Sequence, residues 1–196
     1  MKKIFFVLFA TLVIYNSGYS QKTDSLYSLS AYLGGGYAYN VTTFDYEFPS
    51  LNRGGLQGYA RVMWKPEYLL SGGIEFGYTN LYSVDESSLQ TDSGATSLKT
   101  NVYAYTLMIV FSMPIIENWE VNIGTGFGFT TVNNEAFSTE STSSDVASAS
   151  MISTAYYFPV MKDSRLGGEL GFTALPLYDD YVISLGISFE YKFLEY

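Results

Sequence analysis

The residues of this sequence best suited to chemistry are charged side chains that recur at alternate positions within apolar segments. They are Arg61, Glu75, Glu120, Glu169, Glu190 and Lys192. Carboxylates and bases brought together in this way can form ion pairs, carry protons or ions, or take part in acid–base catalysis. The sequence supplies no nucleophile or substrate cleft beside them. We therefore expect a structural cluster of ion pairs and waters, with a proton or ion pathway as the alternative.

The composition excludes several classes of site. The 196 residues contain neither Cys nor His, which rules out thiol nucleophiles, disulfides, thiolate or imidazole metal sites and a Ser-His-Asp triad. Gly124, Gly126 and Gly128 alternate along a strand with no helix after them, so they do not form a phosphate-binding loop. A net charge of −9 argues against nucleic acid as a partner. We expect no catalytic residue, no cofactor and no metal site.

The elements that must position the six charges are β-strands, because apolar residues alternate with a period of two. The C-terminal segment is the clearest case. One of its faces carries Leu185, Ile187, Phe189, Tyr191 and Phe193, and the other carries Ser184, Gly186, Ser188, Glu190 and Lys192. All six charges fall on the faces opposite the large apolar side chains. The sequence therefore predicts one apolar and one small or polar face on each strand.

The same alternation predicts an all-β fold of eight strands. Their predicted ranges are 26–39, 55–65, 68–82, 98–113, 118–132, 148–161, 166–175 and 181–194. Short turns at 65–67, 114–117 and 162–165 alternate with predicted loops at 40–54, 83–97, 133–147 and 176–180. This alternation is typical of an eight-stranded antiparallel up-and-down barrel with turns at one end and loops at the other.

The faces of these strands distinguish a transmembrane barrel from a soluble one. A soluble barrel packs large apolar side chains inward, but here the opposite face is made of Gly, Ser, Thr and a few charges. Such a face cannot form a soluble core, whereas it suits the narrow lumen of a transmembrane barrel. Aromatic residues lie near both ends of the strands, with Trp64 and Trp119 near the short turns and Tyr37 and Tyr78 nearer the long loops, and they predict two interfacial girdles.

The N-terminal segment predicts export. Lys2 and Lys3 precede an apolar run of about a dozen residues, and small residues up to Ser20 follow it. We expect a cleaved signal peptide at residues 1–20 and a barrel domain at residues 21–196. The predicted location is the outer membrane.

The segments at the two ends of the predicted barrel differ in charge. Ten acidic residues lie in the predicted outer loops: Asp45, Glu47, Asp85, Glu86, Asp92, Glu135, Glu140, Asp145, Asp179 and Asp180. The low-complexity stretch 138–144 is expected to be mobile. Four basic residues near the short turns, Lys65, Lys162, Arg165 and Lys192, are candidates for contact with anionic headgroups.

With these patterns, the chain resembles the OmpA/OmpX-like and PorT-like families of small outer-membrane β-barrel proteins over residues 21–196. The resemblance implies that the last strand is the signal recognised by the barrel assembly machinery, with Leu185, Ile187, Phe189, Tyr191 and Phe193 matching its alternating apolar pattern. Tyr196 departs from that pattern, because it is out of phase with Phe193.

The expected function is that of a non-enzymatic outer-membrane barrel, acting in envelope integrity or presenting its outer loops to a surface partner. Its other expected partners are outer-membrane lipids and the assembly machinery. A narrow channel for small solutes is the alternative. A lipid-modifying barrel enzyme is the third possibility. The resemblance disfavours it, because members of these families that are enzymes typically use His or a similar base, and this sequence has no His.

Overall fold

All the regular secondary structure is β in the residues that the computed structural model describes, which are 27–42, 50–66, 70–91, 94–136, 139–175 and 180–196. Within those ranges no helix is long and apolar enough to cross a membrane. The predicted signal peptide lies outside the described residues. The strands are β1 (Tyr27–Asn40), β2 (Leu51–Asn52), β3 (Gly54–Pro66), β4 (Ser71–Thr91), β5 (Gly94–Ile116), β6 (Trp119–Ala136), β7 (Thr139–Met161), β8 (Ser164–Leu175) and β9 (Asp180–Glu195).

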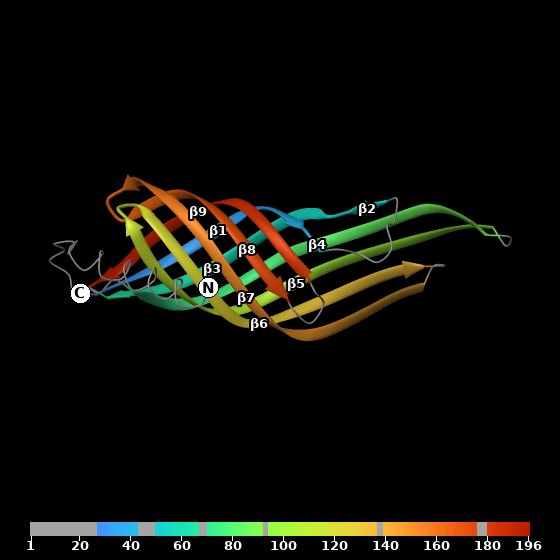
Figure 1. Ribbon diagram of the computed structural model, residues 1–196, viewed down its shortest axis with the longest axis horizontal. Helices are drawn as coiled ribbons and strands as arrows, with labels where there is room; N and C mark the ends of the chain where they lie inside the picture. The colour runs from blue at the N-terminus through green and yellow to red at the C-terminus, as the bar shows by residue number, and fades with distance from the viewer. Residues whose placement is uncertain (1–26, 43–49, 67–69, 92–93, 137–138, 176–179) are drawn as a thin grey trace, which may run out of the picture.

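Eight of these strands close into one antiparallel barrel (Figure 1). From β3 to β9 each strand pairs with the next along the chain, and β1 pairs with both β3 and β9 to complete the ring. The short β2 lies outside the ring and pairs with β4. A closed ring leaves no unpaired edge in the wall, as a sheet within lipid requires. The predicted eight-stranded up-and-down barrel is confirmed.

The two faces of the wall differ as the alternation predicts. On the outer face of β9, the side chains of Leu185 and Ile187 are 66% and 63% exposed. On the inner face of the same strand, Ser188 is 0% exposed. Large exposed apolar side chains of this kind occur on every strand of the ring. A continuous apolar outer surface fits lipid and does not fit water.

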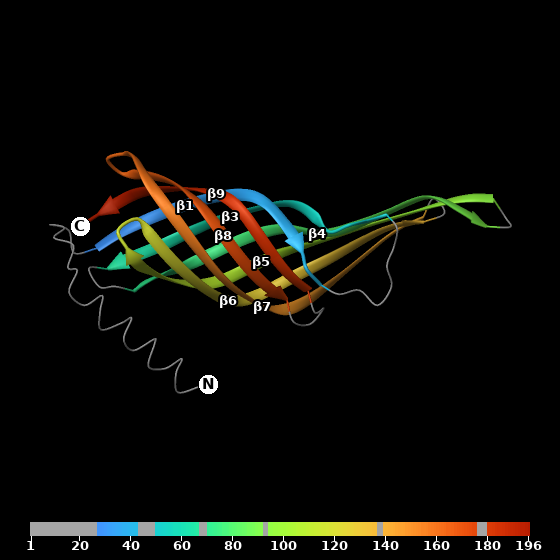
Figure 2. The same cartoon turned by 45° about the horizontal axis from the view of Figure 1, so that its top comes forward.

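The strands on one side of the barrel are much longer than predicted. β4 continues to Thr91, β5 begins at Gly94, β6 continues to Ala136 and β7 begins at Thr139. The predicted loops 83–97 and 133–147 are therefore wrong over most of their length, because they form a sheet that projects beyond the rim (Figure 2). Residues 139–144, expected to be mobile, belong to β7. The prediction failed because neither face of these segments is consistently apolar, so they lack the alternation that marks a strand in the wall.

The acidic residues of the predicted outer loops divide between strands and undescribed segments. Asp85, Glu86, Glu135, Glu140 and Asp145 lie in the projecting strands, and Asp180 begins β9. The remaining four, Asp45, Glu47, Asp92 and Asp179, lie outside the described residues.

The other end of the barrel holds the chain's described termini. The backbones of Tyr27 and Tyr196 bond to each other in both directions, at 3.0 and 3.1 Å. β9 contains a bulge at Phe193, because Lys192 pairs with Ser30 but Leu194 pairs with the preceding residue, Leu29. The extra residue shifts the phase, so that Tyr196 is exposed, with its ring 5.8 Å from that of Tyr27. The bulge explains how a terminal aromatic residue that is out of phase in sequence joins the outer aromatic side chains.

Candidate functional site: the barrel lumen

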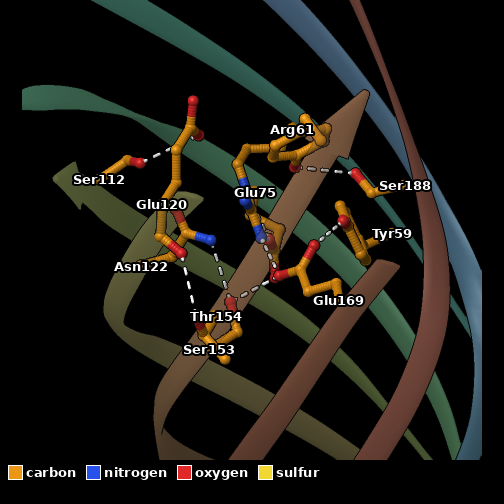
Figure 3. Close-up of polar contacts among 11 residues, drawn as sticks. Tyr59, Arg61, Glu75, Ser112, Glu120, Asn122, Ser153, Thr154, Glu169 and Ser188 are labelled. Atoms are coloured by element: carbon orange, nitrogen blue, oxygen red, sulfur yellow. Dashed lines mark hydrogen bonds and ion pairs between the residues drawn. The ribbon is translucent and has the colours of Figure 1, made fainter. Parts of the chain in front are cut away.

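An ion-pair cluster centred on Arg61 lies inside the barrel (Figure 3). The Arg61 side chain, on β3, lies 2.6 Å from Glu75 Oε2 on β4 and 3.2 Å from Glu169 Oε1 on β8. Glu169 also accepts hydrogen bonds from the hydroxyls of Tyr59 and Ser153. Arg61 is 2% exposed, so its charge is compensated by protein groups and not by bulk water.

A second cluster lies toward the short-turn end. Lys65 on β3 contacts Glu190 Oε1 at 2.7 Å and Glu120 Oε1 at 3.3 Å. Arg165 on β8 contacts Glu120 Oε1 at 2.5 Å and also pairs with Glu190. Two bases and two carboxylates thus form a closed set of four ion pairs that joins β3, β6, β8 and β9 across the lumen. The Ser112 hydroxyl donates to the other oxygen of Glu120 at 3.4 Å.

Aromatic rings lie against both clusters. The guanidinium of Arg61 is 4.8 Å from the Tyr59 ring centroid, and that of Arg165 is 4.7 Å from the Tyr157 ring centroid. Tyr32 lies within 6 Å of both Arg61 and Lys65. Tyr157 and Tyr32 meet edge to face at 6.1 Å. Cation–ring contacts of this kind are stronger where water is excluded, and here they pack the space around the charges.

Apolar side chains complete the filling of the lumen. Leu81, Val102, Leu175 and Val182 are buried and belong to the same core cluster as Tyr32 and Tyr157. The remaining buried apolar members include Met63, Met108, Val110 and Met151. The interior is therefore less polar than the sequence predicts. Small residues make room for these side chains: at Gly128, for example, an added Cβ would lie 2.5 Å from Leu175 Cδ2.

The structure brings together five of the six charged residues singled out from the sequence. Arg61, Glu75 and Glu169 form the central cluster, and Glu120 and Glu190 belong to the second. The exception is Lys192, whose ion pair is with Glu195 at 3.1 Å. Both of those side chains are partly exposed. Lys192 lies next to the bulge near the end of β9, and its ion pair with Glu195 joins two residues of that same strand.

Two other lumen bases, Lys65 and Arg165, are among the residues near the short turns that the sequence offers as candidates for contact with anionic headgroups. That interpretation is wrong, since both side chains pair with Glu120 and Glu190 inside the barrel. The signal was present in the sequence. Lys65 lies four residues after Arg61, and Arg165 lies four residues before Glu169, so a period of two places each pair on one strand face.

A small cavity borders the central cluster. It encloses about 50 Å³ and is lined by Tyr59, Arg61, Glu75, Ser153 and Glu169 together with several glycines. This volume is large enough for a few water molecules. Among the described residues, buried oxygens of Ser30, Tyr32, Asn122 and Thr130 lack a protein hydrogen-bond partner, and water is the natural partner for such groups.

The residues of the predicted assembly strand occupy the outside of β9. Leu185, Ile187, Phe189, Tyr191 and Phe193 are all exposed there. Their inner neighbours Ser188 and Glu190 bond to Tyr157 and to the second cluster, respectively. The apolar side chains on the outside of β9 are thus free to contact lipid or another protein, whereas the inner side chains are bonded to other residues of the lumen.

Comparison with solved structures shows the same fold in small outer-membrane barrels. The chain superposes on the attachment invasion locus protein Ail of Yersinia pestis with a TM-score of 0.50 and 13% identity, covering 85% of this chain and 99% of that one. Neisserial surface protein A gives 0.54 and 9%, with the same coverage of both chains. A major outer membrane protein of Thermus thermophilus gives 0.54 and 13%, again with 85% and 99% covered. No family model matches the sequence, and comparison with curated proteins gives no match.

Proposed function

We propose that this protein is an integral outer-membrane barrel with a closed lumen and no enzymatic activity, which acts at the cell surface through its projecting sheet. The observation that carries the proposal is the length of β4 to β7. The hairpin of β4 and β5 and the hairpin of β6 and β7 continue well past the barrel wall (Figure 2). Strands that served only to cross the membrane would need about 9 to 11 residues. β5 and β7 have 23 each.

The filling of the lumen supports a barrel that does not conduct. Two ion-pair clusters and a set of buried apolar side chains occupy it along its length, and an eight-stranded barrel has little further room. The cavity beside Glu169 is the feature that favours the alternative of a narrow channel. Conduction through it would require the central cluster to separate.

The chemistry of the lumen supports a role without catalysis. The sequence contains neither His nor Cys, and the four lumen carboxylates are each held in ion pairs with Arg61, Lys65 or Arg165. Carboxylates neutralised in this way serve to brace the wall. We propose outer-membrane lipids as the partners of the outer apolar surface and the barrel assembly machinery as the partner of β9 during insertion.

Planar-bilayer recording of the pure refolded protein tests the closed lumen. We expect no reproducible unitary currents, and currents that persist in repeated preparations would establish the channel alternative.

Cell fractionation tests the location, combined with electrophoresis of boiled and unboiled samples. The expected result is an outer-membrane protein whose unboiled form migrates differently. An epitope tag between Thr91 and Gly94, detected on intact cells, tests whether the projecting sheet lies outside. Detection only after the cells are opened would contradict the proposed orientation.

A further inference from the structure

The projecting sheet has one edge that none of the described strands covers. β7 pairs with β6 continuously from Tyr156 back to Thr139, without a register shift. Its pairing with β8 begins only at Ser150. Residues 139–149 of β7 therefore direct the N–H and C=O groups of alternate residues toward the side that β8 does not reach. We call these residues the β7 edge.

Cross-strand contacts hold the β7 edge in an extended conformation. Thr142 Oγ1 donates to Asn133 Oδ1 at 3.0 Å, and the hydroxyls of Thr131 and Ser144 lie 3.4 Å apart. Residues Ser141 to Val146 are all exposed. The edge is thus both ordered by its neighbour β6 and accessible from the opposite side.

The opposite edge of the projecting sheet, on β4, is built differently. β2 pairs with β4 at Ser83 and Val84, which occupies that edge at the level of the rim. Farther out, the pairing of β4 with β5 is irregular between Glu86 and Leu89. A covering strand and a bulge are two of the devices by which proteins prevent an edge from pairing with another chain. The β7 edge has no bulge, no proline and no lysine.

The charge near the β7 edge indicates what can pair with it. The edge contains Glu140 and Asp145, Glu135 lies on the adjacent strand, and residues 133–149 include no basic residue. Opposite charges on neighbouring strands stabilise a sheet and like charges destabilise it. A second copy of this chain would bring the same acidic edge, so a segment carrying Lys or Arg is the better match.

We propose that the β7 edge is a docking site that accepts an extended segment of another protein as an added β-strand, with Lys or Arg on both faces of that segment. Both faces are involved because Glu140 and Asp145 are five residues apart and therefore belong to opposite faces of β7. Main-chain hydrogen bonds would supply the pairing, and the acidic side chains would select the basic segment. This inference rests on the proposed function, in that the projecting sheet must face a partner.

Hydrogen–deuterium exchange on the full barrel, refolded in lipid nanodiscs, tests the proposal. The probe is an eight-residue peptide of sequence KKTTKKTT, which carries Lys on both faces of the strand, and its control has Glu in place of each Lys. We expect the Lys peptide to slow exchange at the β7 edge at least tenfold, with less effect at high salt. Equal effects of both peptides, or slowed exchange on β4 instead, would overturn the proposal. So would slowing that grows with protein concentration in the absence of peptide, because that result assigns the edge to a second copy.

Charge variants test the selection of a basic segment. Asp145→Lys should weaken the effect of the Lys peptide at least tenfold. Asp85→Lys makes the same charge change on β4 and should leave it unchanged. Heat-dependent mobility of each variant establishes that it is folded. Equal weakening by the two substitutions would show a general charge effect and refute the site.

Proline variants test the main-chain pairing. Ser143 and Ser144 are consecutive, so one N–H points at β6 and the other at the free side. Proline removes the backbone N–H of the residue that it replaces, so one of the variants Ser143→Pro and Ser144→Pro disrupts pairing with β6 and the other removes an N–H on the free side. The variant of the second kind is recognised by an unchanged exchange pattern in β6. In that variant, the Lys peptide should no longer slow exchange at the β7 edge. A peptide effect that survives in that variant would contradict strand addition. These readouts are independent of conductance, so a conducting barrel would refute the closed lumen and leave the docking edge standing.

Discussion

Replacing Arg61 by methionine should be among the most destabilising single changes in this protein. Methionine keeps much of the side chain's apolar volume but leaves Glu75 and Glu169 as buried carboxylates without their shared cation. Removing one partner of a buried ion pair costs about 3–5 kcal/mol. Loss of the contact with the Tyr59 ring, 4.8 Å away, adds about 1 kcal/mol. Uptake of a proton by either carboxyl group would recover part of this cost.

We therefore expect Arg61→Met to lower the free energy of unfolding by about 4 kcal/mol at neutral pH, or nearly a thousandfold in the folding equilibrium. The loss should shrink in acid, because protonated carboxyl groups no longer carry an uncompensated charge. Urea unfolding in lipid, followed by gel mobility, measures both effects.

Lys192→Met is the matched control. Lys192 is also a basic residue near the lumen, but its ion pair with Glu195 is partly exposed, and such pairs contribute at most about 1 kcal/mol. If the two substitutions cost the same at neutral pH, the central cluster does not stabilise the barrel and the reasoning fails.

Three further outcomes follow from the geometry of the wall. Ile187→Asp places a charge on the lipid face and should block insertion. Ser188→Ala loses only the hydrogen bond to Tyr157, which contributes about 1 kcal/mol, and should be tolerated. If a membrane-fraction assay shows that both variants insert equally well, the assignment of the two faces is wrong. Gly36→Ala would place a Cβ 2.2 Å from a backbone oxygen of β9 and should cost about 1–3 kcal/mol in urea unfolding. At Gly168 an added Cβ meets nothing within 4 Å, so Gly168→Ala should change the free energy of unfolding by no more than about 0.5 kcal/mol. A larger loss of stability for Gly168→Ala than for Gly36→Ala would contradict this packing.

The wall of the barrel could be predicted from sequence because lipid on one side and a packed lumen on the other impose a period of two. Each apolar residue of β9 from Leu185 to Phe193 follows that period, as do the lumen charges from Arg61 to Glu190. The same period identifies Lys65 and Arg165 as lumen residues, because Lys65 shares the parity of Arg61 and Arg165 shares that of Glu169.

The projecting strands could not be predicted in the same way. Around Ser143 the side chains on both faces of the strand are exposed, so apolar and polar residues do not alternate there. Backbone pairing with β6 maintains the strand there, and backbone hydrogen bonds leave little trace in side-chain type.

The sequence by itself determined that this chain forms strands with one oily and one polar face, because that contrast is local and repeats every second residue. Only the tertiary structure decided which charges meet. Lys65 and Glu190 are 125 residues apart and Arg61 and Glu169 are 108 apart, yet each pair is joined across the lumen. Strand order and register set those distances, and both depend on how the whole ring closes.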